Sequence, residues 1–147
     1  MMRLKRPVEC FLASLILSVV VASLVGCGTG NVTINQVKLN ASSLGSGWTL
    51  SKEVEANSAN AAAGSIIPQL YKAGAVRIVN QIFVKGNEKL QVNLVQMDNA
   101  QDAKTAVKLL NSVAGGVNTI GAKQNIAFEI IGSPANRAMA AKALNIQ

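Results

Sequence analysis

Alternating apolar and polar positions predict a β-hairpin in the middle of the chain. Residues 75–84 form a strongly apolar run, and residues 89–97 alternate between apolar and amide side chains. Such alternation is typical of an antiparallel strand that has one face on the core. Residues 85–88, Lys-Gly-Asn-Glu, predict the turn between the two strands. The expected inward positions of the second strand are Leu90, Val92 and Leu94.

Two further strands are expected, one on each side of the hairpin in sequence. Residues 48–55 form the first, and residues 125–131 form the other, with apolar side chains at every second position of the latter. In the first of these strands, the side chains expected to face the core are those of Trp48, Leu50 and Val54.

Capping and breaking residues predict three helices. The first covers residues 66–73, with Ser65 as the N-cap and Pro68 in the first turn. A second helix follows the sequence 98–101, which resembles a capping box, and runs to about residue 114. The third begins at Ser133-Pro134 and continues through an alanine-rich stretch to about residue 144.

The predicted order is strand, helix, strand, strand, helix, strand, helix. Its first six elements match the split βαβ, ferredoxin-like pattern βαββαβ, and a C-terminal helix is added. We therefore expect an α+β fold, a single domain over residues 48–147. Its helices would pack on one face of an antiparallel sheet, which leaves the other face polar or free to bind a ligand.

The N-terminus has the character of a secretory signal. Residues 1–9 contain Arg3, Lys5 and Arg6, and the 16 residues from 10 to 25 carry no charge. This apolar run is shorter than the roughly 18–20 residues that span a bilayer comfortably. A basic start, a short apolar run and small residues at its end are typical of a signal peptide.

The end of the apolar run, Leu24-Val25-Gly26-Cys27, resembles the lipobox of bacterial lipoproteins. The resemblance implies that residues 1–26 are a signal peptide removed before Cys27, and that the Cys27 thiol receives a diacylglyceryl group. Two acyl chains hold a protein stably on a membrane. The expected location is the outward face of the cell membrane or of an outer membrane. The alternatives are an uncleaved signal anchor or cleavage by the ordinary signal peptidase.

Residues 27–47 are expected to form the lipidated cysteine and a flexible tether. Gly, Ser, Thr and Asn dominate this segment, as in flexible linkers. Its few apolar residues also alternate, so the alternative is a short strand around residues 32–39.

Composition narrows the possible functions. The chain has no histidine, which removes imidazole as a metal ligand or general base, and aromatic residues make up 3%. From residue 27 onward, eleven Lys and Arg against six Asp and Glu leave a net charge of +5, and the cations are scattered. Few aromatics and scattered charge argue against nucleic-acid binding. No metal-binding, phosphate-binding or cofactor motif is present, so no cofactor is expected.

These observations favour a membrane-anchored, noncatalytic binding module of the cell envelope, with a protein or a ligand as its partner. The candidate contact residues are Trp48, Tyr71 and Arg77: two amphipathic aromatics and a cation expected on the exposed sheet face. One alternative is an accessory subunit that joins an envelope complex by edge-strand pairing or hydrophobic docking. Another is a small hydrolase with a serine–lysine pair.

Overall fold

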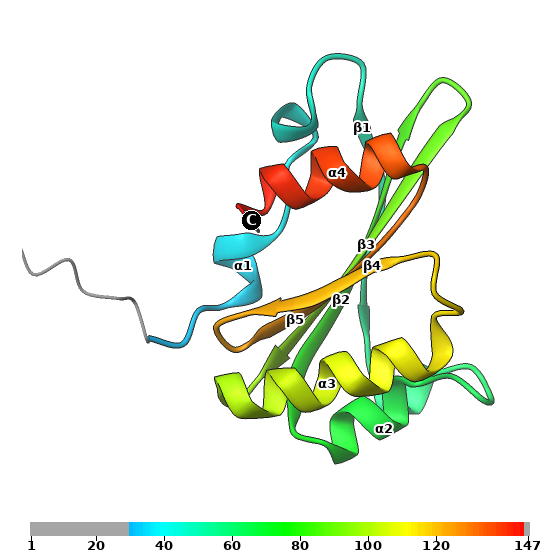
Figure 1. The fold of residues 1–147 in the computed structure, drawn as a ribbon. Coiled ribbons are helices and arrows are strands. Elements are labelled where there is room, and N and C mark those ends of the chain that lie inside the picture. The colour runs from blue at the N-terminus through cyan, green and yellow to red at the C-terminus, as the bar shows by residue number, and fades with distance from the viewer. Residues whose placement is uncertain (1–29, 146–147) are drawn as a thin grey trace, which may run out of the picture.

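The computed structural model describes residues 30–145, and an antiparallel sheet is the centre of this part of the chain (Figure 1). Its strand order is β1-β2-β3-β5-β4, and each neighbouring pair is antiparallel. The strands are β1 (Thr49–Ala56), β2 (Ala75–Lys85), β3 (Glu88–Met97), β4 (Thr119–Lys123) and β5 (Ile126–Ile131). The α+β class and the antiparallel sheet are thereby confirmed.

Short and long helices connect and cover these strands. In the described part of the chain, the α-helices are α1 (Ile34–Val37), α2 (Ile67–Lys72), α3 (Ala100–Val113) and α4 (Pro134–Ala143). Two 3₁₀ turns, η1 (Ala41–Leu44) and η2 (Ser58–Asn60), flank β1. Within residues 30–145, none of these helices is both long and apolar enough to cross a membrane.

The hairpin β2–β3 forms as predicted and contributes the two longest strands. Leu90, Val92 and Leu94 are each at most 1% exposed and face one side, whereas Gln91 and Asn93 face the other. Lys85 pairs with Glu88, so Gly86 and Asn87 make the turn, with Gly86 in the left-handed region at φ 57°. Alternation fixes the register here because a slip by one residue would turn every side chain to the opposite face of the sheet.

The helix boundaries follow the predicted signals, with two corrections at the caps. The N-cap of α2 is Ile66 and not the predicted Ser65, whose hydroxyl makes no capping hydrogen bond; Pro68 lies in the first turn as expected. α4 begins as expected: Ser133 is its N-cap, and its hydroxyl accepts from the Asn136 N–H at 3.2 Å. The cap of α3 is Asn99, one residue later than the predicted Asp98. The Asn99 side-chain oxygen accepts from the N–H groups of Gln101 and Asp102, both at 2.9 Å. One amide oxygen thus satisfies two of the free N–H groups at the helix start.

The helices cover both faces of the sheet, which corrects the expectation of one covered face. α1, η1 and α4 pack on one face, and α2 and α3 pack on the other (Figure 1). The physical reason lies in the central strands. β5 presents Ile126, Phe128 and Ile130 to the first face and Ala127 to the second, and all four are buried. A strand that is apolar on both faces needs cover on both.

The ferredoxin-like strand order is not confirmed, because β1 pairs directly with β2 and the order is β1-β2-β3-β5-β4, with β4 at the edge beside β5. This five-residue strand was not predicted. It carries Gly121, whose missing side chain leaves room for the Phe128 ring: a Cβ there would lie 2.6 Å from the ring carbon Cζ. The local strand signal is weak because Gly121 and Ala122 have low strand propensity and the strand is short.

Residues 30–47 are folded against the sheet, in contrast to the predicted tether and to the alternative of a short strand. Ile34, Leu39 and Leu44 are at most 4% exposed and belong to the core of the first face. Gln81, fully buried on β2, accepts from the Leu39 N–H at 3.0 Å and donates to the Leu39 carbonyl at 3.1 Å. The side-chain amide therefore replaces a missing backbone partner for this segment.

The first strand is less buried than its pattern predicts. Trp48 is 7% exposed, but Leu50 and Val54 are 42% and 39% exposed. β1 is an edge strand with a register irregularity between Leu50 and Lys52, and the helices leave nearly all of its residues open to solvent. The inward placement of Leu50 and Val54 is therefore wrong.

Candidate functional site

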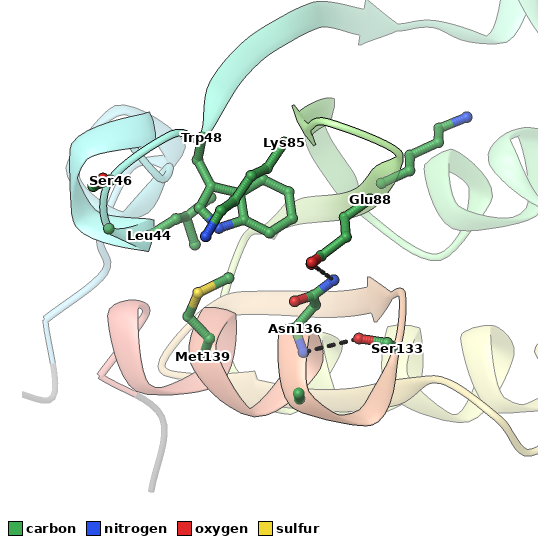
Figure 2. Close-up of a pocket in the computed structure, with 11 residues that line it drawn as sticks. Leu44, Ser46, Trp48, Lys85, Glu88, Ser133, Asn136 and Met139 are labelled. Atoms are coloured by element: carbon green, nitrogen blue, oxygen red, sulfur yellow. Dashed lines mark hydrogen bonds between the residues drawn. The ribbon is translucent and has the colours of Figure 1, made fainter.

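Three segments that are distant in sequence enclose a groove, which we call the Trp48 groove (Figure 2). They are the η1 end and the loop before β1, the β2–β3 turn, and the first half of α4. The groove has a volume of about 660 Å³. Its lining includes Leu44, Ser46, Trp48, Lys85, Glu88, Lys89, Ser133, Asn136 and Met139.

The floor of the groove is apolar. Leu44 is 3% exposed and Trp48 is 7% exposed, and both belong to the core of the first sheet face. The Trp48 ring and the Met139 side chain point toward each other (Figure 2). Gly45 and Gly47 have φ values of 93° and 85°, which favour glycine, and they turn the chain from η1 into β1. This local turn places Trp48 over the end of the sheet.

The rim of the groove is polar and carries the Lys85 side chain (Figure 2). Lys89 also borders the groove, but on β3 it shares the face of Gln91 and Asn93, so its side chain points away. Lys85 and Lys89 are exposed and stand on either side of the hairpin turn. The Asn136 side chain, 8% exposed, donates to the Glu88 carboxylate at 2.9 Å and so joins α4 to the turn. An apolar floor with a few polar groups around it is the common composition of a ligand site.

The groove offers contacts for binding, and one of its two lining serines, Ser133, already has a capping role. The Ser133 hydroxyl accepts a hydrogen bond as the cap of α4. For the described lysines, the recorded hydrogen bonds of Nζ run from Lys38 to Glu53 and from Lys123 to the Asn145 carbonyl, both at 3.0 Å. A serine–lysine pair would require a lysine ammonium within reach of a serine hydroxyl.

Arg77 lies away from the groove, on the face that α1 covers. Its guanidinium donates to Glu55 at 2.9 Å and to the Asn35 side chain at 3.0 Å. The bond to Glu55 raises the pKa of Arg77 further above its ordinary value. Beside this pair, Glu53 accepts from Lys38, and that bond lowers the pKa of the Glu53 carboxyl. Arg77 is thus part of an ion-paired row between β1, β2 and α1.

Tyr71 lies on the opposite face of the sheet, in α2. Its hydroxyl donates to the Ala56 carbonyl at 2.6 Å and ties α2 to the end of β1. Burial raises the pKa of this phenol. The three candidate contact residues are therefore separated, and of these only Trp48 lies at the groove. Lys85, Lys89, Asn136 and Met139 join it there, although their own segments carry no local signal for a shared site.

The lipobox residues Leu24, Val25, Gly26 and Cys27 precede the described residues. Within residues 30–145, no three acidic or cysteine side chains gather as they would around a metal ion. Comparisons of the chain with protein-family models, with curated proteins and with solved structures find no match.

Proposed function

We propose that this chain is a lipid-anchored binding module of the cell envelope, and that it binds its partner through the Trp48 groove. The observation that carries the proposal is the groove itself: a buried Trp and Leu floor beside the exposed Lys85, framed by the β2–β3 hairpin and α4 (Figure 2). Aromatic side chains supply large contact area at low entropic cost. The partner is expected to present an apolar side chain next to an acidic group.

The position of the groove supports a partner that lies away from the membrane surface. Asn31 donates to the Asp98 carbonyl at 2.6 Å, and the Val32 N–H donates to the Asn125 side chain at 2.7 Å. Four residues after Cys27, an extended chain has covered at most about 14 Å. The groove includes Glu88, at the other end of β3 from Asp98. A ten-residue strand spans about 34 Å, so the anchor and the groove would be well separated.

The groove is tested by reversing its two lysines. We expect Lys85→Glu with Lys89→Glu to reduce recovery of a copurifying envelope protein by about tenfold, because charges at an interface rim steer and orient an acidic partner. The measurement is a native mass spectrum of the full-length protein extracted from its own membranes in mild detergent. The matched control reverses Lys104 and Lys108, two exposed lysines of α3. Equal recovery with both double variants would place the partner elsewhere.

One structural feature favours the assembly alternative. β1 is an edge strand with Leu50 and Val54 exposed, and an open apolar edge is a template for strand addition by another chain. The same spectra separate the two hypotheses. A partner that survives reversal of the groove lysines but is lost when Leu50 and Val54 are changed to lysine would indicate pairing along β1.

The anchor is tested at Cys27. The Cys27→Ser chain should carry no lipid, because serine lacks the thiol that receives the diacylglyceryl group in this class. Intact-mass measurement should find acyl chains on a wild-type protein that starts at Cys27, and none on the variant. Cys10→Ser is the control and should mature as the wild type does. A Cys27→Ser protein that matures and partitions into the membrane like the wild type would overturn the lipobox interpretation.

A further inference from the structure

A second hollow lies on the opposite face of the sheet from the Trp48 groove, between α2, α3 and the strands. We call it the α2 cavity. Its volume is about 270 Å³, just below the range of about 300–1,000 Å³ that is usual for small-molecule sites. Apolar side chains make up most of its wall, among them Ile66, Ile67, Leu70, Val95 and Leu110.

The sheet side of the α2 cavity carries a connected row of polar side chains. Asn80, Asn93 and Glu129 are directly opposite one another on β2, β3 and β5. The Asn80 amide donates to the Asn93 side-chain oxygen, which also accepts from Gln91 at 3.2 Å. Asn93 in turn donates to the Glu129 carboxylate at 2.7 Å. The row is therefore pre-organised across three strands.

Glu129 is the charged end of this row, and its described partners are neutral. It is 8% exposed, and its two carboxylate oxygens accept from Asn93 and Asn118, each at 2.7 Å. The described ion pairs engage Glu53 and Glu55 instead, and no lysine or arginine is among the residues that line the cavity. A buried carboxylate is costly without a countercharge, and amide donors offset only part of that cost.

Hydrogen-bond acceptors are in excess around the cavity. A carboxylate offers about four acceptor positions, and the hydrogen bonds from Asn93 and Asn118 use two of those on Glu129. The Ser65 hydroxyl oxygen, which borders the cavity next to α2, is buried and has no hydrogen-bond partner among residues 30–145. An occupant that donates hydrogen bonds would satisfy both groups, since the Ser65 hydroxyl can accept as well as donate. An anionic occupant would instead face the Glu129 charge.

We propose that the α2 cavity binds a small organic cation, with an ammonium group on the Glu129 carboxylate and an apolar body against α2. A metal ion is a poor occupant, because the single carboxylate supplies too few oxygen ligands for one and the apolar wall supplies none. The apolar body matches the isoleucine and leucine side chains, and the ammonium supplies both the missing donors and the countercharge. This site is separate from the Trp48 groove and does not depend on the proposed function.

The test compares three probes of nearly the same shape and different charge: cyclohexylammonium, cyclohexanol and cyclohexanecarboxylate. The full-length protein in zwitterionic lipid nanodiscs, with labelled isoleucine and methionine methyl groups, is titrated with each probe, and empty nanodiscs correct for partitioning. We expect the ammonium to bind about tenfold more tightly than the alcohol and the carboxylate not to bind. The shifted signals should be those of Ile66, Ile67 and Ile78, and the Met139 signal in the groove should stay unchanged.

Variants then separate charge from shape. Glu129→Gln should remove the tenfold preference for the ammonium over the alcohol. Glu88→Gln is the matched control, since Glu88 also accepts from an asparagine but lies outside the cavity. If Glu129→Gln does not fold, Ala56→Leu fills the cavity from β1 with Glu129 in place, and it should weaken both the ammonium and the alcohol. Equal affinity of the wild type for the two probes, no binding of either, or shifts confined to the groove would each overturn the proposal.

Discussion

Single residues decide whether two elements of this protein can approach each other. Gly121 on β4 faces the Phe128 ring, which is 3% exposed, and a Cβ there would lie 2.6 Å from Cζ of the ring. Gln81 shows the converse case, in which a polar side chain is buried because its amide pairs with both backbone groups of Leu39. In both cases a tertiary neighbour explains the residue type: Phe128 on the paired strand for Gly121, and Leu39, which is distant in the sequence, for Gln81.

The close contact at Gly121 leads to a stability prediction. Gly121→Ala should lower the free energy of unfolding by about 1–3 kcal/mol, because the added methyl overpacks the site against a buried ring. Urea denaturation of the full-length protein measures the change. Gly30→Ala is the control, since a Cβ at Gly30 meets nothing within 4 Å. Adding Phe128→Leu to Gly121→Ala should recover part of the loss, and equal stability of the two alanine variants would contradict the close contact.

At the scale of elements, α1 and η1 are held by packing more than by their own propensity. They are four residues each, which is too short for a helix to be stable by itself. Their buried side chains, Ile34 and Leu44, lie on the core that α4 also covers. The predicted helices α3 and α4 differ from them because caps and apolar spacing support them locally.

Packing of α1 is tested with Ile34→Ala. Ile34 is fully buried, so we expect the variant to lose about 2–5 kcal/mol of unfolding free energy from lost burial and the cavity that remains. Val117→Ala, at a valine that is 69% exposed, should change the unfolding free energy by less than about 0.5 kcal/mol. Denaturation curves that coincide for Ile34→Ala and the wild type would restore the tether interpretation of this segment.

At the scale of the whole molecule, covering both faces of the sheet places the two candidate sites on opposite sides of it. The Trp48 groove lies on the α4 face near the β2–β3 turn, and the α2 cavity lies on the α2–α3 face. They differ in chemistry. The rim of the groove carries Lys85 and the Glu88 carboxylate, whereas among residues 30–145 no cation borders the cavity, whose carboxylate has amide partners.

The sequence by itself determined the elements whose signals are local. Alternation over residues 89–97 predicted β3, and the Ser133-Pro134 pair predicted the start of α4. The apolar strand patterns, together with the helix signals between them, predicted an α+β fold. The lipobox at Cys27 is also read from neighbouring residues alone, and it remains a prediction.

Only the tertiary structure decided the features that depend on distant partners. β4 can pair with β5 because Gly121 leaves space for the Phe128 ring. Residues 34–44 fold because they pack on the sheet and hydrogen-bond to Gln81. The second face of the sheet is covered because β5 has apolar side chains on both of its faces. The groove and the cavity belong to the same group, since each joins three or more segments. Local propensity carries no information about such contacts, because their free energy comes from burial between residues far apart in the chain.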